Sequence, residues 1–287
     1  MNKFAIFTDS GADIGKGELE KWGVRSFSLS FRFADENTEY TDNEILPKVF
    51  YSKMRDGAVA KTSATNPSVA YESFDAAFRE GLDILYLGFS SGLSTTYSSA
   101  LLALSELKKK YPERRAVSVD TLCASAGLGM LVYCAVRMRE EGMPLDEIAR
   151  KIENMKLSIC HWFTVEDLVY LKRGGRIGSA SALVGGMLGI KPIMHVDNEG
   201  HLVNVEKVRG RKRSILALAE KYSIWVKDRA LPVFISHADC EEDALFLAGC
   251  IKQQRNLNVE YITSVGAVIG AHSGPGTLAL FFIGKER

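Results

Sequence analysis

The 287-residue sequence has few cysteines, no long hydrophobic run, no excess charge of one sign and no internal repeat. Its five cysteines are isolated, with no Cys-x-x-Cys pair, so neither a zinc site nor a disulfide framework is indicated. The longest apolar stretch, Ala124–Val136, is too short for a bilayer span, which needs about 20 residues. The strand pattern at Phe4–Phe7 follows no signal-peptide-like segment. We expect a cytoplasmic protein with reduced thiols and no stable membrane insertion.

The balance of charge also limits the partners. The net charge is +1, which does not favour nucleic acid as a partner. Basic residues are concentrated between Leu168 and Ile215, where nine Lys or Arg face only three acids. This stretch is interpreted either as a solvated face or as a docking surface for an acidic partner.

Nucleotide-binding motifs are missing as well. The sequence contains no Gly-x-x-x-x-Gly-Lys-[Ser/Thr] loop. The segment Gly270–Gly276 superficially resembles a dinucleotide fingerprint, but Pro275 interrupts it and Thr277–Ile283 has a strand pattern. The glycines around His272 instead predict a tight loop that aims the imidazole, in either a structural role or contact with a ligand carboxylate.

The pattern of apolar residues predicts two domains, because 287 residues exceed the usual size of one. The first half alternates short apolar strands with helices, which is typical of a parallel α/β sheet. The second half has a hairpin turn at Asp197–Gly200 and a helix ended by Gly174 and Gly175. We predict an α/β fold with an N-terminal three-layer parallel-sheet domain (residues 1–156) and a C-terminal α+β domain with a mixed sheet (residues 157–287).

A run of hydroxyl side chains is the most informative feature that is present. Eight of the ten residues from Ser90 to Ser99 carry a hydroxyl, between a predicted strand at Asp83–Leu87 and a predicted helix from about Ser94. Free N–H groups at the start of a helix stabilise an anion. The run therefore predicts a site for a negatively charged group.

The same run also permits an enzymatic interpretation. Gly88–Gly92 fits Gly-x-Ser-x-Gly, the nucleophile elbow of α/β-hydrolases. Ser90 would then be the nucleophile, with His272 and either Asp120 or Asp239 completing the triad. No His-Gly-Gly-Gly-type oxyanion segment precedes it, and the predicted helix begins several residues too late for an elbow.

A second hydroxyl segment, Lys61–Ser68, precedes another predicted helix. Thr65 or Asn66 is suited to cap that helix, with Pro67 at its first position. Thr62 and Ser63 come too early for capping and remain free to donate hydrogen bonds to an anion.

Two further features have alternative interpretations. Asp9, at the end of the first predicted strand, is suited to cap the following loop or to act as a metal ligand or acid–base group. Ala180–Met194 combines Met, Leu and closely spaced Gly, which suits either core packing or an apolar ligand channel.

Together these segments resemble the DegV family of bacterial fatty-acid-binding proteins, the lipid-presenting subunits of fatty acid kinase. The matching segments occur in family order over essentially the whole chain: Thr8–Ser10 with Ala12–Asp13, Lys61–Ser63 with Asn66–Ser68, Ser90–Ser94 with Thr96–Tyr97, Val119–Thr121, Tyr170–Ile177, Ile190–Ile193 and Gly274–Gly276. One position differs, because Thr95 stands where the family commonly has glycine. A side chain there could crowd the carboxylate loop.

The resemblance implies a non-catalytic carrier of a long-chain fatty acid, such as a C16–C18 acid, with no cofactor and no metal. By matching position, Thr62 and Ser94 would hydrogen-bond the carboxylate, with Ser63 and His272 as neighbours. A separate ATP-dependent kinase subunit would phosphorylate the bound acid, and the acyl-phosphate would feed phospholipid synthesis. Arg173, Arg176 and Arg209 are candidates for docking that kinase. The alternatives are a serine hydrolase that uses Ser90 and a scaffold protein without a ligand.

Overall fold

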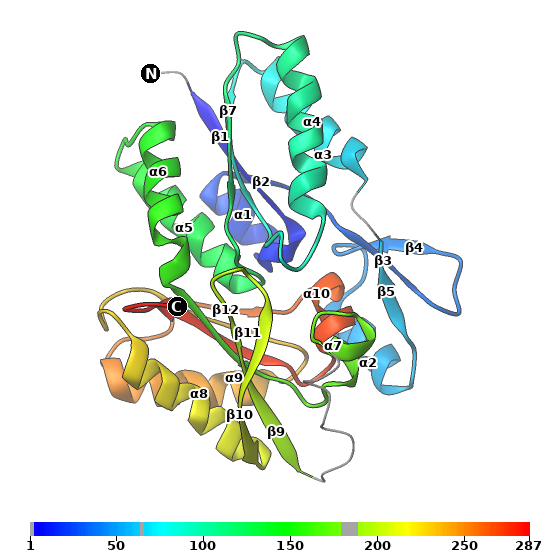
Figure 1. Cartoon of the computed structure of the whole chain (residues 1–287), viewed down its shortest axis with the longest axis vertical. Coiled ribbons are helices and arrows are strands. Elements are labelled where there is room, and N and C mark those ends of the chain that lie inside the picture. Colours follow the sequence, from blue (N-terminus) through cyan, green and yellow to red (C-terminus); the bar gives the residue numbers. More distant parts are fainter. Residues whose placement is uncertain (1–2, 64–65, 179–188) are drawn as a thin grey trace.

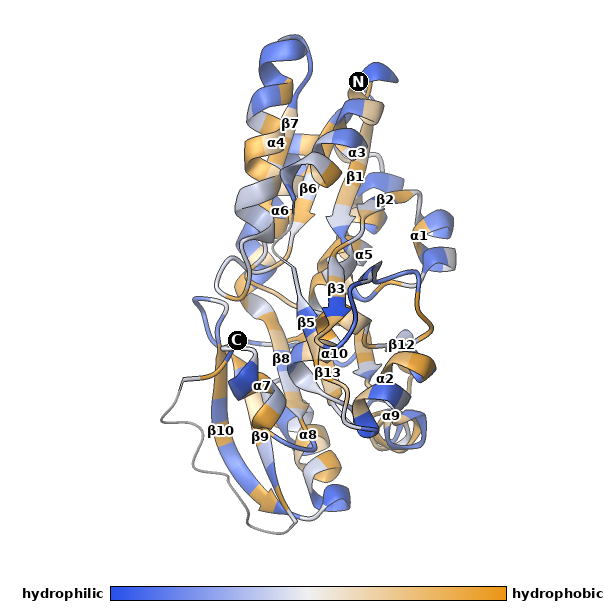
Figure 2. Cartoon of the chain, turned by 90° about the vertical axis from the view of Figure 1, so that its right-hand side faces the viewer, coloured by the Kyte–Doolittle hydropathy of each residue, from blue (hydrophilic) through white to orange (hydrophobic). Residues whose placement is uncertain are grey.

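The computed structural model describes residues 3–63, 66–178 and 189–287, which form three β-sheets and their covering helices (Figure 1). The first sheet is parallel throughout and comes from the first half of the chain. Its two inner strands are the most deeply buried and appear hydrophobic along much of their length in Figure 2. In spatial order its strands are β2 (Val24–Phe27), β1 (Phe4–Asp9), β6 (Asp83–Gly88) and β7 (Ala116–Asp120).

Helices cover both faces of the parallel sheet. Side chains alternate along each strand, so apolar residues point to both faces and pack against helices on each side. Phe7 and Tyr86 point into the cluster that α3 and α4 cover, and Ile6 and Leu87 into the cluster under α5 and α6. This confirms the predicted three-layer α/β arrangement. These helices and the short helix before β2 are α1 (Lys16–Trp22), α3 (Pro67–Arg79), α4 (Thr96–Lys110), α5 (Ala126–Glu140) and α6 (Leu145–Met155).

The second sheet is mixed, as predicted, and comes from the second half of the chain. Only β11 and β12 pair in parallel, and its other neighbours are antiparallel. Helices α8 (Arg211–Trp225) and α9 (Glu241–Arg255) cover one face, where a separate apolar cluster lies. In spatial order its strands are β10 (Leu202–Arg209), β9 (Ile190–Val196), β8 (Ile159–Thr164), β13 (Leu278–Ile283), β11 (Val233–His237) and β12 (Tyr261–Ser264).

The third sheet is a small antiparallel one that the sequence pattern does not reveal. It has the order β4 (Glu39–Thr41), β3 (Ser30–Phe33) and β5 (Ala60–Thr62), and helix α2 (Pro47–Arg55) follows β4. The aromatic side chains of β3 and α2 share one apolar cluster with residues of the second half of the chain, such as Val268. The two halves therefore share a core, and the domain boundary after residue 156 stays a prediction.

Two short helices lie between the small sheet and the mixed sheet: α7 (Val169–Arg173) and α10 (Ala267–Ser273). The predicted tight loop around His272 is wrong, because His272 lies in α10. Gly270 is needed there for close packing, since a Cβ at this position would lie 2.3 Å from the Tyr51 hydroxyl. Two 3-10 turns, Ser10–Ala12 and Lys156–Ser158, complete the described elements.

Asp9 joins the ends of β1 and β6. Its carboxylate accepts hydrogen bonds from the backbone N–H of Gly11 and Phe89 and from the Tyr86 hydroxyl. Burial raises the pKa of Asp9 to about 6. These bonds confirm the loop-capping role, and they fix the start of the hydroxyl run after β6.

No described helix is both long enough and apolar enough to cross a membrane.

Candidate ligand-binding site

A cavity of about 460 Å³ lies between the hydroxyl run, strand β5, helix α10 and the face of the mixed sheet that is turned away from α8 and α9. Its volume is within the range of small-molecule pockets. Among the residues that the structure describes, no Asp, Glu or Cys lines it. Its polar groups are hydroxyls, two imidazoles and one guanidinium, so no carboxylate in the wall opposes a bound anion.

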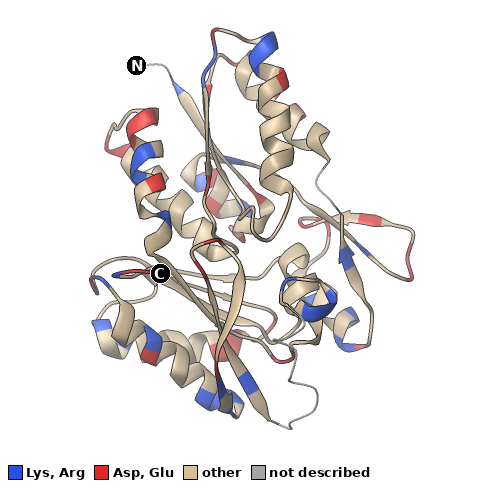
Figure 3. Cartoon of the chain, in the orientation of Figure 1, with Lys and Arg blue, Asp and Glu red and all other residues tan. Residues whose placement is uncertain are grey.

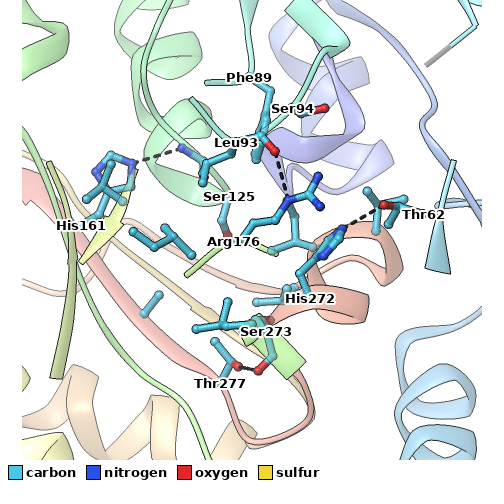
Figure 4. A pocket seen from close by; sticks show the side chains of 18 of the residues that line it. Thr62, Phe89, Leu93, Ser94, Ser125, His161, Arg176, His272, Ser273 and Thr277 are labelled. Carbon is cyan, nitrogen blue, oxygen red and sulfur yellow. Dashed lines mark hydrogen bonds between the residues drawn. The ribbon is translucent and has the colours of Figure 1, made fainter. Parts of the chain in front are cut away.

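Thr62 and His272 meet on one side of this cavity (Figure 4). Thr62 is the last residue of β5, where its backbone pairs with Phe31 of β3. Its Oγ1 lies 2.9 Å from Nε2 of His272. Pairing with β3 and the position of His272 in α10 therefore hold the two side chains together, although 210 residues separate them in sequence.

His272 is held as a neutral imidazole. Burial, together with the positive charge of Arg176, lowers its pKa to about 4. Gly174 leaves room for the ring, because a Cβ there would lie 2.2 Å from Nδ1. A neutral imidazole with its proton on Nε2 donates to Thr62 and leaves the Thr62 hydroxyl free to donate to an anion.

Ser94 lies just before α4 on the cavity wall. Its Oγ is 2.8 Å from Oγ1 of Thr96 and accepts a 3.2 Å hydrogen bond from the Thr96 N–H. Ser94, the residue before the N-cap Thr95, thus accepts the first N–H of α4, and Thr95 itself makes no side-chain capping bond. Thr95 and Thr96 also line the cavity. The predicted position of the hydroxyl run between a strand and a helix is confirmed.

Ser63 also lines the cavity but is more exposed than Thr62. Its hydroxyl donates to Oε1 of Glu39, at 2.5 Å. The structure therefore brings Thr62, Ser63, Ser94 and His272 to one cavity, and Ser63 already has an acidic partner there.

Arg176 is set apart from the other two predicted docking arginines. It lines the cavity, where its Nε donates to the Leu93 carbonyl at 3.1 Å and its Nη1 to the Gly174 carbonyl at 2.5 Å. Burial lowers its pKa. Arg173 and Arg209 are exposed, on α7 and β10, and basic residues are visible on these elements in Figure 3. Only these two remain candidates for docking a partner.

The face of the mixed sheet that is turned away from α8 and α9, and is partly covered by α5, forms the apolar wall. Phe163 of β8 and Ala279 of β13 are direct partners across the sheet, and Phe281 pairs with His161 in the next row of the same face. His161 is buried and accepts from the Ala124 N–H at 3.2 Å. This wall offers apolar contact over most of its area.

Two serines interrupt that apolar wall. Ser125, which precedes α5, and Ser236 of β11 both line the cavity, with their hydroxyl oxygens 2.9 Å apart. Ser125 also contacts Oδ2 of Asp13 at 2.5 Å, and Oδ1 of Asp13 accepts the Gly266 N–H. The sequence does not predict this pair, because a single serine within an apolar strand does not show whether its side chain points into a cavity.

Ser90 is not arranged as a nucleophile. It is fully buried, and its hydroxyl donates to the Gly200 carbonyl at 3.0 Å. Asp120 accepts from the backbone of Ser91 and Leu122, whereas Asp239 pairs with an arginine of α2. Within the described ranges, these side chains do not form the triad that the hydrolase interpretation requires.

Two sequence predictions concern segments near the cavity. Thr95 has φ −78° and ψ 0°, which any residue adopts, and its side chain is exposed, so glycine is not required there. Most of the Ala180–Met194 segment lies outside the described residues. Its described end enters β9, where Ile193 and Met194 are buried. Thr65 also lies outside them, and Asn66 caps α3 by accepting from the Ser68 N–H.

One group of possible metal ligands occurs in the described part of the chain, at the β9–β10 turn. Ligand atoms of Asp197, Glu199 and His201 lie within 4.8 Å of one another. Oδ1 of Asp197 already accepts the backbone N–H groups of Glu199 and His201. These bonds are those of an Asx-type turn, which accounts for the clustering.

Comparison with known proteins shows the family to which the chain is related. A family model described as "Uncharacterised protein, DegV family" matches residues 3–285. A DegV domain-containing protein of Clostridium perfringens is 43% identical, over 100% of this chain and 99% of that protein.

Solved structures match over the whole chain as well. A "degv lipid binding protein" of Thermotoga maritima has 31% identity and a TM-score of 0.85, covering 99% of both chains. A structure described as "Fatty Acid Binding of a DegV family Protein", from Thermus thermophilus, has 30% identity and a TM-score of 0.86, covering 98% of this chain and 99% of that one. The chain therefore belongs to the DegV family.

Proposed function

We propose that this protein binds a long-chain fatty acid in the cavity, with the carboxylate at Thr62 and Ser94 and with His272 and Ser63 as neighbours. The observation that carries the proposal is one cavity with hydroxyl donors on one side and an apolar sheet face on the other. The names of the Thermotoga and Thermus structures, which describe lipid and fatty-acid binding by those proteins, support it.

The energetics fit such a ligand. Each buried methylene contributes about 0.8 kcal/mol, so a long acyl chain has ample free energy for tight binding. A carboxylate removed from water needs several donors, because an unpaired buried charge is prohibitively costly. Thr62 and Ser94 are neutral donors that leave the carboxylate oxygens available for reaction. A bidentate arginine pair would cover them instead.

His272 then acts through Thr62. When the neutral ring donates from Nε2, the Thr62 oxygen is an acceptor towards His272 and directs its own hydrogen to the carboxylate. Protonation of the ring is disfavoured by burial and by Arg176. In this tautomer His272 is a positioning residue that keeps Thr62 a donor towards the carboxylate.

The second part of the proposal concerns transfer. The bound acid is presented to a separate kinase subunit that holds ATP. A carboxylate oxygen attacks the γ-phosphorus, a new P–O bond forms, and the bond to the β–γ bridging oxygen breaks to release ADP. The product is an acyl-phosphate that feeds phospholipid synthesis. The sequence of this chain contains no P-loop motif, which is consistent with a partner that supplies the nucleotide.

Exchanging the exposed basic residues tests the transfer step. Arg173→Glu with Arg209→Glu should lower acyl-phosphate formation by the kinase subunit and ATP at least about tenfold, because charge reversal removes complementarity to an acidic partner. Fatty-acid affinity, measured by titration, should stay unchanged. Arg150→Glu is the matched control, since Arg150 is exposed on α6. Unchanged phosphorylation by the double variant would contradict docking at this surface.

A further inference from the structure

A hydroxyl pair lies in the wall that the proposed acyl chain would contact. Ser236 is in the same row of the mixed sheet as Ala279 and Phe163, all on the face turned away from α8 and α9, and its hydroxyl oxygen lies 2.9 Å from that of Ser125. A saturated hydrocarbon chain makes no use of hydroxyls. Apolar side chains of similar size would pack against it at least as well.

The backbone at Ser125 indicates that its side chain is needed. Ser125 has φ 54° and ψ −146°, a combination that residues other than glycine adopt only under strain. Helix α5 begins directly after it, yet the Ser125 side chain makes no capping hydrogen bond to that helix. Capping therefore does not explain why a serine, rather than a glycine, occupies this position.

The Ser236 hydroxyl keeps hydrogen-bonding capacity that the cluster does not use. Ser125 donates to Oδ2 of Asp13 at 2.5 Å, and its oxygen lies 2.9 Å from that of Ser236. A hydroxyl offers one hydrogen and two lone pairs, whereas the Ser125 hydroxyl is the one side-chain partner of Ser236 among the described residues. At least one hydrogen-bonding position of the Ser236 hydroxyl is therefore open to a further polar group.

We propose that the Ser125–Ser236 pair recognises an oxygen substituent on the acyl chain, so that oxygenated fatty acids, carrying a hydroxyl or a carbonyl, are a ligand class of this protein. The inference rests on the proposed function, because it assumes that the acyl chain passes this wall. It assigns the selection among acyl chains to the serine pair, which is separate from Thr62 and His272 at the proposed carboxylate position. The substituent would replace the partner that the Ser236 hydroxyl lacks.

Competitive binding to the delipidated full-length protein tests this assignment. The probes are octadecanoic acid and a series of monohydroxy and oxo octadecanoic acids that differ in the position of the oxygen. The variants are Ser236→Ala, which leaves the Ser125–Asp13 contact intact, and Ser125→Gly, which also relieves the backbone strain. Ser273→Ala is the comparison variant, because Ser273 is another buried serine of the wall and its hydroxyl has no hydrogen-bond partner among the described residues, which makes it the competing site for an oxygen substituent. Loss of the positional preference in Ser273→Ala would overturn the assignment to the Ser125–Ser236 pair.

We expect one position of the oxygen to bind about three- to tenfold more tightly than its isomers, the effect of a single neutral hydrogen bond. This preference should disappear in Ser236→Ala and Ser125→Gly and persist in Ser273→Ala. Equal binding of all isomers by the wild-type protein would overturn the assignment. So would a loss of octadecanoic acid affinity in Ser236→Ala as large as the loss for the oxygenated acids, because the pair would then hold the carboxylate.

The same experiment separates this inference from the proposed function. If octadecanoic acid binds without any positional preference in the series, only the assignment of the serine pair fails. If one oxygenated acid binds and octadecanoic acid does not, the assignment holds and the ligand class is narrower than proposed. If none of the acids binds, both fail.

Discussion

Replacing Thr62 by valine and Ser94 by alanine in the same chain is expected to lower fatty-acid affinity by about 3 kcal/mol or more, roughly a hundredfold. Each change removes a hydrogen bond to a charged acceptor, and such bonds contribute about 1.5–3 kcal/mol each. Valine keeps the shape of threonine, so the pairing of β5 with β3 is retained. Titration of delipidated protein with a long-chain fatty acid measures the effect.

The matched control for this double variant is Ser98→Ala. Ser98 belongs to the same hydroxyl run but is exposed on α4 and is not part of the cavity wall. Its replacement should leave affinity unchanged. If the Thr62→Val, Ser94→Ala protein binds as tightly as the wild type, the carboxylate lies elsewhere in the cavity.

Replacing Ala279 by phenylalanine is expected to abolish binding of the acyl chain. Ala279 lies on the sheet face turned away from α8 and α9, beside Phe163, and lines the cavity. A phenyl ring there would occupy space that the chain needs, so affinity should fall at least about a hundredfold. The ligand-free protein should keep its thermal stability or gain some, because a ring that enters an existing cavity fills it.

Val205→Phe is the control for this substitution. Val205 is on β10 of the same sheet, where it is 50% exposed and does not line the cavity. The same ring at that position should affect neither binding nor unfolding. Retention of full affinity by Ala279→Phe, with an unchanged melting temperature, would mean that the acyl chain does not pass this face.

The large elements could be predicted because their patterns are long and regular. Strand β13 lies within the predicted strand pattern at Thr277–Ile283, and α3 begins at Pro67 behind its Asn66 cap. Strand β5 could not be predicted, because three residues are too few to show alternation. Helix α10 was also missed, since its glycines oppose a helix and packing against Tyr51 overrides that preference.

The site shows the same limit. The hydroxyl run, Thr62 and His272 could be identified from residue type and position, and Thr62, His272 and part of the run line one cavity. Which serine of the run lines the cavity depends on the direction of its side chain, and the sequence does not show that direction. Ser90 fits a catalytic pattern but points to the Gly200 carbonyl, whereas Ser94 lines the cavity. Arg176 belongs to a basic stretch in sequence, but its bond to Leu93 places it in the cavity wall.

The most direct measurement of the central claim is organic extraction of the purified protein followed by mass spectrometry. The account predicts that the wild-type protein carries a long-chain fatty acid, at most one per protein molecule. The Thr62→Val, Ser94→Ala double variant and the Ala279→Phe variant should carry little or none. The account further predicts that the delipidated wild-type protein takes up added fatty acid. Repeated absence of any fatty acid from the wild-type protein, together with no binding of added fatty acid, would contradict it.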